Sequence, residues 1–157
     1  MKLQIATRHA LLAVLELATQ AEHHMSASEI ADKYGISPSH LAKVLRTLGR
    51  EGLVEAARGV GGGYRFAANA KRHNLLEIIR IFESIGSSAT DDLEGGDDTP
   101  EGQALRIVFK EIEDTACATL SSITIETMLK LVNKINAKRA TTSSAREDVS
   151  RKSSARK

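Results

Sequence analysis

The chain has 157 residues, enough for one domain with extensions, and its formal net charge at pH 7 is +2. It contains no Trp and only 3% aromatic residues, so its core must be built from aliphatic side chains. No apolar run approaches the roughly 20 residues that span a bilayer, and the N-terminus lacks the long apolar region of a signal peptide. These features predict a soluble, cytoplasmic protein without a membrane segment.

The charge is distributed unevenly along the chain. Residues 1–86 carry 11 Lys and Arg against 8 Asp and Glu, residues 87–137 carry 4 against 10, and residues 138–157 carry 7 against 2. Basic ends around an acidic middle suggest a polyanionic partner. The same pattern is also compatible with an ordinary solvated surface, so charge alone does not decide the function.

Two helices are predicted near the N-terminus. Residues 6–19 carry apolar side chains at the spacing of an amphipathic helix, whose predicted buried face consists of Leu11, Val14, Leu15 and Ala18. Ser26 and Glu29 have the spacing of a capping box, which predicts a short second helix. This helix should run to about Tyr34 and be closed by Gly35.

A third helix should begin at Ser37 and Pro38, which suit the N-cap and the first helical position, and should end near Glu51. Its apolar residues recur at helical spacing and predict a buried face of Leu41, Val44, Leu45 and Leu48. The opposite face is polar and mostly composed of hydrogen-bond donors, namely Ser39, His40, Lys43, Arg46, Thr47 and Arg50.

The segment RGVGGGYR, residues 58–65, contains four of the eleven glycines of the chain. A phosphate-cradling loop would need a Gly-Lys-Ser/Thr ending, which is missing here. Residues 53–57 and 64–67 flank the glycines as two short strands, so the segment is predicted to be a hairpin whose glycines allow positive φ. A fourth helix should follow to about Ile85, and this order of elements is typical of a winged helix-turn-helix.

The second half of the chain should contain two more helices. Residues 87–98 are predicted to form a flexible acidic loop, followed by a long helix that starts at Thr99 and Pro100 and runs to about Leu120. Thr124 should cap a last helix. The predicted organisation is a winged helix-turn-helix domain at 1–86, dimerisation helices at 99–137 and a disordered basic tail at 138–157, in a mainly α fold.

The third helix and the hairpin together predict an interface with double-stranded DNA. Such a helix fits the major groove, and an Arg on the hairpin, here Arg58, can enter a narrow minor groove. Each residue alone is compatible with an ordinary solvent-facing surface, but the combination favours DNA contact. The expected contact residues are Ser28, Ser37, Ser39, His40, Lys43, Arg46, Thr47, Arg50, Arg58, Gly59, Gly61, Gly62, Gly63 and Arg65.

The chain resembles the Rrf2 family of bacterial transcription regulators, of the IscR, NsrR and CymR type, in three stretches. They read ATRHALLAVLELA, SASEIADKYGISPSHLAKVLRTLGREGLVEAARGVGGGYRFA and LLEIIRIFE. The resemblance covers about residues 1–83 and implies a homodimer, joined through the long helix, that binds a pseudo-palindromic operator. The residues expected to join the dimer are Leu105, Val108, Phe109, Ile112, Ala116 and Leu120. We hypothesise a sequence-specific repressor.

The chain differs from the family in one region of chemical importance. Sensor members of the family carry three cysteines in the region that corresponds to residues 84–103, where they bind an iron–sulfur cluster. This chain has none there, and its one cysteine, Cys117, falls within the long helix. We therefore expect no cofactor and no metal site. A redox switch through Cys117 is an alternative, which would need an exposed and reactive thiolate.

Two further alternatives belong to other functional classes. An enzyme is not predicted, because no Ser/His/Asp or Cys/His arrangement stands out and the five histidines lack metal-ligand spacing. A winged-helix module that binds protein instead of DNA would show apolar residues on the outward face of residues 39–50, where this sequence has cations. No motif identifies a small-molecule effector.

Overall fold

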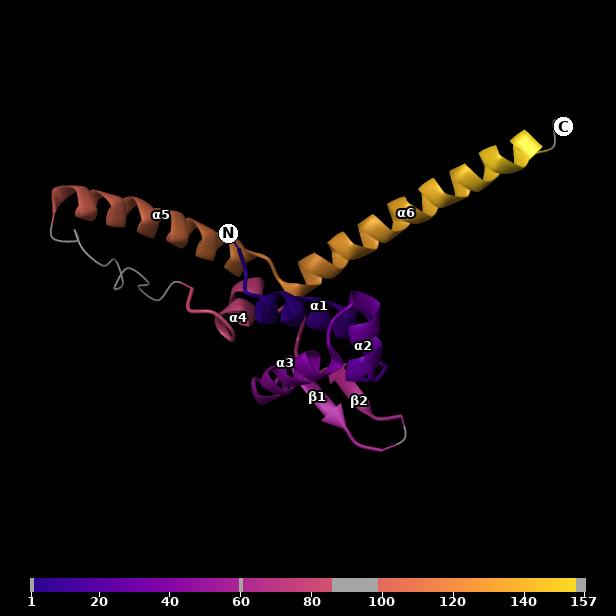
Figure 1. The fold of residues 1–157 in the computed structure, drawn as a ribbon, viewed down its shortest axis with the longest axis horizontal. Helices are drawn as coiled ribbons and strands as arrows, with labels where there is room; N and C mark the ends of the chain where they lie inside the picture. The colour runs from indigo at the N-terminus through magenta and orange to yellow at the C-terminus, as the bar shows by residue number, and fades with distance from the viewer. Residues whose placement is uncertain (1, 60, 86–98, 155–157) are drawn as a thin grey trace.

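The first half of the chain folds into three helices followed by a hairpin (Figure 1). The helices are α1 at Ile5–Thr19, α2 at Ala27–Tyr34 and α3 at Pro38–Arg50, and the strands are β1 at Val54–Ala57 and β2 at Gly63–Phe66. Three helices follow, α4 at Leu75–Arg80, α5 at Pro100–Ser122 and α6 at Ile125–Ser154. The computed structural model describes residues 2–59, 61–85 and 99–154.

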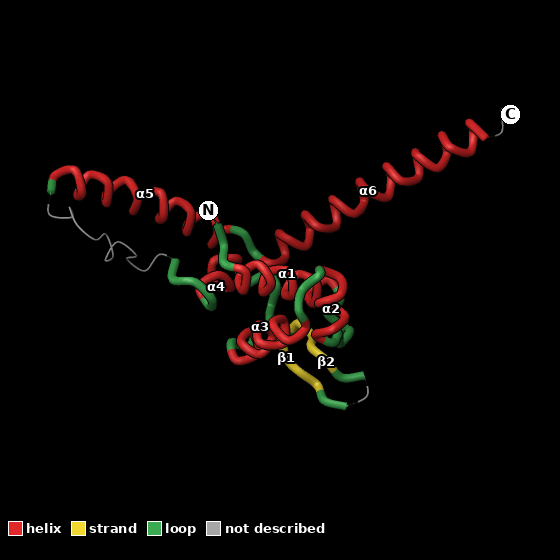
Figure 2. Tube along the Cα trace, in the orientation of Figure 1, coloured by secondary structure: helices red, strands yellow, loops and turns green. Residues whose placement is uncertain are grey.

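This order confirms the predicted winged helix-turn-helix fold. In Figure 2 the hairpin projects from one side of the cluster formed by α1, α2 and α3, whereas α5 and α6 leave the cluster on the other side and diverge from each other. None of the helices in the described ranges is long and apolar enough to cross a membrane.

The ends of α2 follow the sequence rules. The hydroxyl oxygen of Ser26 accepts a hydrogen bond from the Glu29 backbone N–H at 3.1 Å, and the Glu29 carboxylate accepts one from the Ser26 backbone N–H at 2.6 Å, which completes the predicted capping box. Gly35 ends the helix with a φ of 64°. Ser37 occupies the N-cap of α3 as predicted, but its hydroxyl is bonded to that of Ser39 at 3.0 Å and not to a backbone N–H.

The buried face of α1 differs from the predicted one. Ala10, Ala13 and Leu17 are fully buried with Val14, whereas the other three predicted positions are only partly buried. The helix is apolar on almost every side, so apolar periodicity does not single out one face. The polar positions Thr7 and Glu16 lie on the buried face because each finds a hydrogen-bond partner there.

The hairpin is extended by a third segment that the sequence did not reveal. β1 and β2 are antiparallel, with Ala56 opposite Tyr64. On the other edge of β2, Tyr64 donates to the carbonyl of Met25 at 2.8 Å and accepts from the Met25 N–H at 2.9 Å. The residue that precedes the α2 capping box therefore holds the hairpin against the helices.

The fourth helix is shorter than predicted. It ends at Arg80, and the next backbone bonds, from Ile81 to Ile78 and from Phe82 to Ile79, close tighter i to i−3 turns. The chain turns here because the Glu83 carboxylate is directed to the start of α1, where it accepts hydrogen bonds from the Gln4 N–H at 2.7 Å and from the Thr7 hydroxyl.

The C-terminal segment also differs from the expectation. Residues 138–154 continue α6 instead of forming a disordered tail, and no Gly or Pro follows Gly102 to stop a helix. The predicted cap at Thr124 is present, since its hydroxyl accepts from the Thr127 N–H at 3.1 Å. Ile125, at the start of α6, is fully buried in the core of the winged domain. The predicted acidic loop at 87–98 lies outside the described residues.

Candidate nucleic-acid interface

The two faces of α3 divide as predicted. Leu41, Val44, Leu45 and Leu48 are buried against the other helices, and this packing fixes the direction of the opposite face. Along that face Ser39, Lys43, Arg46 and Arg50 are exposed and, at spacings of three and four residues, form one stripe. A helix in this setting offers donors and three positive charges to a surface that approaches it.

The C-terminal part of this stripe is organised by local hydrogen bonds. The Thr47 hydroxyl donates to the Lys43 carbonyl at 3.2 Å and accepts from the Arg50 guanidinium at 3.3 Å. The Thr47 hydroxyl is thus bonded within the helix, both to its backbone and to the Arg50 side chain. Two predicted contacts precede the helix: Ser28 is exposed on α2, and Ser37 lies at the turn between α2 and α3.

His40 lies differently from the rest of the predicted contacts. Its ring packs edge-on against the ring of His9 in α1, with the centroids 5.0 Å apart. His40 is half-buried, so one side of its ring belongs to the contact between α1 and α3. The sequence pattern placed His40 on the outward face but gave no indication of this partner.

The glycines of the hairpin are required for two different physical reasons. Gly59 and Gly61 have φ values of 97° and 78°, and a Cβ on either would meet nothing within 4 Å, so only the turn geometry requires glycine. A Cβ on Gly62 would lie 2.4 Å from the Ala57 carbonyl oxygen, and one on Gly63 would lie 2.6 Å from that of Met25. Contacts within the protein therefore already require glycine at Gly62 and Gly63, whether or not these residues also contact DNA.

The two arginines at the base of the hairpin are not equivalent. Arg58 is exposed and immediately precedes the glycine tip. Arg65 forms an ion pair across the two strands with Glu55, which lies directly opposite it. Arg58 is accordingly the better candidate for contact with a groove, whereas Arg65 stabilises the hairpin and neutralises Glu55.

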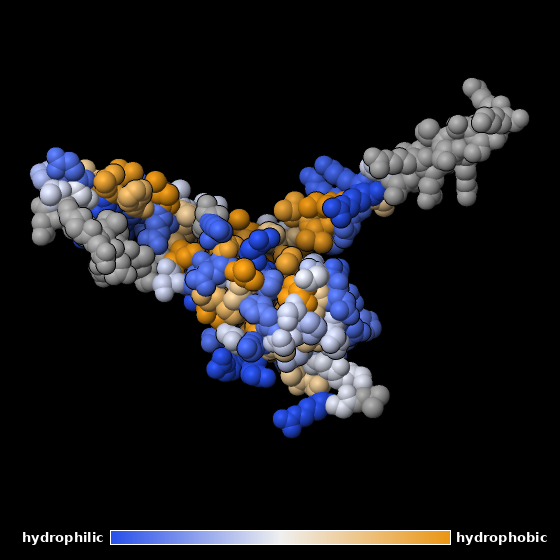
Figure 3. All heavy atoms as spheres, viewed as in Figure 1, coloured by the Kyte–Doolittle hydropathy of each residue, from blue (hydrophilic) through white to orange (hydrophobic). Residues whose placement is uncertain are grey.

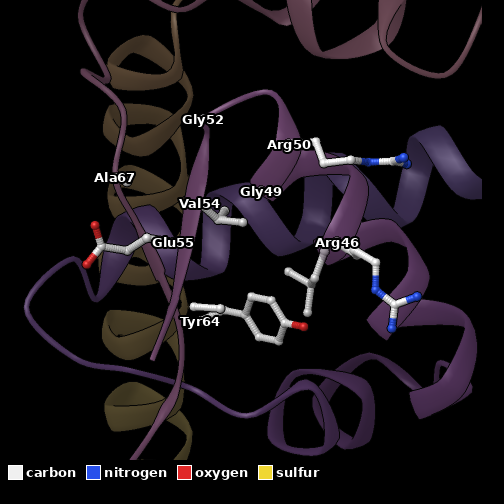
Figure 4. Close-up of a pocket in the computed structure, with 10 residues that line it drawn as sticks. Arg46, Gly49, Arg50, Gly52, Val54, Glu55, Tyr64 and Ala67 are labelled. Atoms are coloured by element: carbon white, nitrogen blue, oxygen red, sulfur yellow. The ribbon is translucent and has the colours of Figure 1, made fainter. Parts of the chain in front are cut away.

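A groove separates α3 from the hairpin, and its central residue was absent from the predicted contact set. The groove has a volume of about 640 Å³ and is lined by residues that include Arg46, Arg50 and Tyr64. In Figure 4 the Tyr64 ring lies between the strands and α3, with Arg46 and Arg50 on one side of the view and Glu55 on the other. Tyr64 was overlooked because a single aromatic residue in a short strand is typical of core packing.

The apolar face of α5 is exposed to solvent in the single chain. Leu105, Val108, Phe109 and Ile112 each expose between 52% and 60% of their surface, although they follow helical spacing. The other two predicted dimer residues, Ala116 and Leu120, are partly buried near the end of α5 that joins α6. Figure 3 shows hydrophobic side chains gathered along α5 and at the base of α6. A soluble chain rarely leaves such a face uncovered.

Cys117 lies on α5 and is partly exposed. Within the described ranges no group of three or more His, Cys, Asp or Glu side chains is placed to hold a metal ion. The thiol therefore stands apart from any cluster of ligands in the part of the chain that the structure describes.

Comparison with known proteins places this architecture in a family. Residues 3–131 match the family described as Rrf2, iron-dependent transcriptional regulator. BadM of Rhodopseudomonas palustris, named as an HTH-type transcriptional regulator, is 48% identical over 133 residues, which cover 85% of this chain and 84% of BadM.

Two solved structures are similar over most of their length. CymR, the global cysteine regulator of B. subtilis, has a TM-score of 0.70 at 27% identity and is matched over 83% of this chain and 98% of CymR. IscR of T. potens has a TM-score of 0.68 at 25% identity, over 84% of this chain and 88% of that IscR. The chain therefore belongs to the Rrf2 family and is a DNA-binding transcriptional regulator.

Proposed function

We propose that the protein is a homodimeric repressor that binds a pseudo-palindromic operator in promoter DNA and does so without an iron–sulfur cluster. The observation that carries this proposal is the exposed stripe of Ser39, Lys43, Arg46 and Arg50 on α3, beside a hairpin in which Arg58 immediately precedes the glycine tip. A stripe of donors on a helix of this size suits the major groove, and an Arg next to glycines suits the minor groove.

The order of residues along α3 divides their roles. Ser39 and Lys43 lie in the N-terminal half of the helix, which in helix-turn-helix proteins reaches base edges. Lys43 can donate to guanine O6 or N7 and so contributes to sequence preference. Arg46 and Arg50 lie toward the C-terminal end, where contacts with phosphates fix the position of the helix but carry no sequence information.

The exposed face of α5 supports the dimer. Four apolar side chains at helical spacing would be covered if the same helix of a second copy packed against them, as in a two-fold symmetric interface. Two winged domains related by such an axis would read two half-sites about 34 Å apart, one turn of DNA. Symmetry in the protein then accounts for a pseudo-palindromic operator.

The ligand set argues against an iron–sulfur cluster, although the family is described as iron-dependent. Iron–sulfur clusters are generally held by four protein ligands, most often thiolates, and this chain has one cysteine. That cysteine, Cys117, lies within α5. We propose that iron is not part of this regulator's DNA-binding form.

The direct test is selection of bound fragments from sheared genomic DNA, followed by footprinting and by affinity measurements on the selected site at several salt concentrations. We expect a protected two-fold symmetric site. Lys43→Ala should reduce the preference for one base pair in each half-site, and Arg58→Ala should weaken binding to all sequences. Asp32→Asn changes an exposed residue of α2 and serves as the matched control. Its affinity for the selected site should be closer to that of the wild type than the affinity of either of the other two variants.

Three results would contradict parts of this proposal. Selection of no discrete site would refute sequence-specific binding, and a monomer in complex with one half-site would refute the dimer. Protein purified without oxygen should be colourless and free of iron. Stoichiometric iron with absorbance in the visible range would show that ligands other than a cysteine set hold a cluster.

A further inference from the structure

We propose that Tyr64 is a DNA-backbone contact and that the groove between α3 and the hairpin holds a phosphodiester of the DNA strand that passes from the major to the minor groove. This inference rests on the proposed DNA-binding function and adds a binding residue to it. The ligand chemistry is a phosphate monoanion attached to a sugar, recognised by one hydroxyl and two guanidinium groups.

Tyr64 is held in place by its backbone and by its ring. Its backbone N–H and C=O both bond to Met25, at 2.8 and 2.9 Å, and on the other edge of β2 it lies opposite Ala56 in β1. Its ring also packs against the hydrophobic core. A side chain fixed in this way loses little conformational entropy when a ligand binds, which favours its use as a contact.

The two tyrosines of the chain differ in what their hydroxyl groups contact. The Tyr34 hydroxyl donates to the Glu16 carboxylate at 2.8 Å and is thus occupied inside the protein. For the Tyr64 hydroxyl no hydrogen bond is formed with any of the residues that the structure describes, and Figure 4 shows it pointing to the side of the groove where Arg46 lies. A hydroxyl in such a place can donate to a phosphate oxygen.

The lining of the groove carries a net positive charge. Arg46 and Arg50 line the groove, and the one acidic side chain in the lining, Glu55, is paired with Arg65. The groove therefore presents two positive charges that are not balanced within its own lining. Its volume of about 640 Å³ falls within the range of ligand pockets, roughly 300 to 1,000 Å³, and its floor of Leu45 and Val54 suits the apolar face of a deoxyribose.

The position of the groove identifies its occupant. It lies between the helix proposed to enter the major groove and the hairpin proposed to enter the minor groove, so the strand that separates those two grooves must cross it. A free phosphate-bearing molecule has the same chemistry and is the competing source. The two sources are separated by measuring inorganic phosphate and duplex DNA side by side.

The experiment uses the full chain labelled with 3-fluorotyrosine, because two tyrosines give two fluorine resonances that Y34F and Y64F assign. A short mixed-sequence duplex should shift the Tyr64 resonance and leave the Tyr34 resonance in place. In parallel, anisotropy of a labelled duplex should show that Y64F binds roughly tenfold more weakly, as expected for one hydrogen bond to a charged group.

The salt dependence separates a binding role from a structural one. Y64F removes no charge, so the slope of log affinity against log salt should stay that of the wild type, whereas Arg50→Gln should lower it by about 0.9. Y34F is the matched control and should keep wild-type DNA affinity. Thermal unfolding of Y64F checks that the retained ring preserves the fold.

Three other outcomes would refute the Tyr64 contact, and each can be told apart from the others. Wild-type affinity of Y64F together with an unmoved Tyr64 resonance would overturn the contact while leaving the DNA-binding function intact. Failure of the wild-type protein to bind any duplex would overturn both. A Tyr64 shift with inorganic phosphate but not with the duplex would assign the groove to a free phosphate ligand and refute the backbone contact.

Discussion

The imidazole ring of His9 in α1 lies edge-on to the ring of His40 at the start of α3, with the ring planes 78° apart. Nδ1 of His9 and Nε2 of His40 are buried, and neither has a hydrogen-bond partner among the described residues. Burial lowers the pKa of His9, and its electrostatic interactions with His40 and Arg8 lower that pKa further. The first turn of α3 therefore packs against a histidine whose protonation the fold disfavours.

This contact predicts a loss of stability in mild acid. Because the pKa of His9 is lower in the folded chain than its ordinary value of 6.5, the unfolded chain takes up the proton first as the pH falls. The contribution of neutral His9 is complete above about pH 6.5 and is lost below it, toward the folded-state pKa. His9→Phe keeps a ring against His40 without titrating, so urea unfolding of this variant should lack that part of the pH dependence.

The control for this experiment is His23→Gln, which changes an exposed histidine in the loop after α1 and should leave the wild-type pH profile unchanged. If the H9F variant lost stability below pH 6.5 in parallel with the wild type, the assignment to His9 would be refuted.

A second prediction concerns the glycines of the hairpin. Gly63 has a φ of 151°, and an added Cβ would lie 2.6 Å from the Met25 carbonyl oxygen, so Gly63→Ala must displace the segment that holds β2. Gly59→Ala faces only the strain of positive φ. We expect losses of unfolding free energy of about 3 kcal/mol for Gly63→Ala and about 1 kcal/mol for Gly59→Ala, measured by urea unfolding. Equal losses would show that the Met25 contact does not constrain this position.

A third prediction concerns Glu16, a nearly buried carboxylate that joins α1 to α2. It accepts hydrogen bonds from Lys33 at 2.6 Å, from Tyr34 at 2.8 Å and from Gln20 at 3.1 Å. Burial acts to raise the pKa of Glu16, but the hydrogen bonds from Lys33 and Tyr34 and the Lys33 charge outweigh it, so the net pKa is lowered.

Stability from a carboxylate with a lowered pKa is present above its ordinary value of 4.5 and is lost as the pH falls through the folded-state value. Glu16→Gln should therefore cost about 1–3 kcal/mol near neutral pH and flatten the acid limb of the stability profile. The comparison is Glu22→Gln, at an exposed position just after α1. An acid limb that is unchanged in the E16Q variant would place the titrating group elsewhere.

The local rules of helix and turn chemistry predicted most of the winged domain. Helix ends are fixed by interactions within a few residues, as at Ser26 with Glu29, at Gly35 and at Pro38. Such ends can therefore be predicted from the sequence alone. The exposed face of α3 was also predictable because its polar and apolar residues alternate with the helical period.

Contacts between distant segments were not predictable in the same way. Glu83 is 79 positions from Gln4, and Met25 is 39 positions from Tyr64, and neither pair has a spacing rule. The same distinction applies to the candidate DNA-binding site. Lys43 and Arg58 could be predicted from their residue types and their positions in the sequence. The place of Tyr64 in a groove could not, because it depends on how the hairpin folds against α3. The helical end of the chain was missed because composition rich in Ser, Thr and charge resembles that of disordered segments.

The last prediction tests the proposed dimer on two faces of one helix. Ile112 belongs to the exposed stripe with Leu105, Val108 and Phe109, whereas Ile107, also exposed, lies on the opposite side of α5. Ile112→Glu should place a charge in the interface and give a monomer in sedimentation velocity, with roughly hundredfold weaker operator binding because the two domains no longer bind as one unit. Ile107→Glu introduces the same charge outside that face and should remain a dimer. A dimeric I112E variant, or a monomeric I107E variant, would show that the copies meet through a different surface.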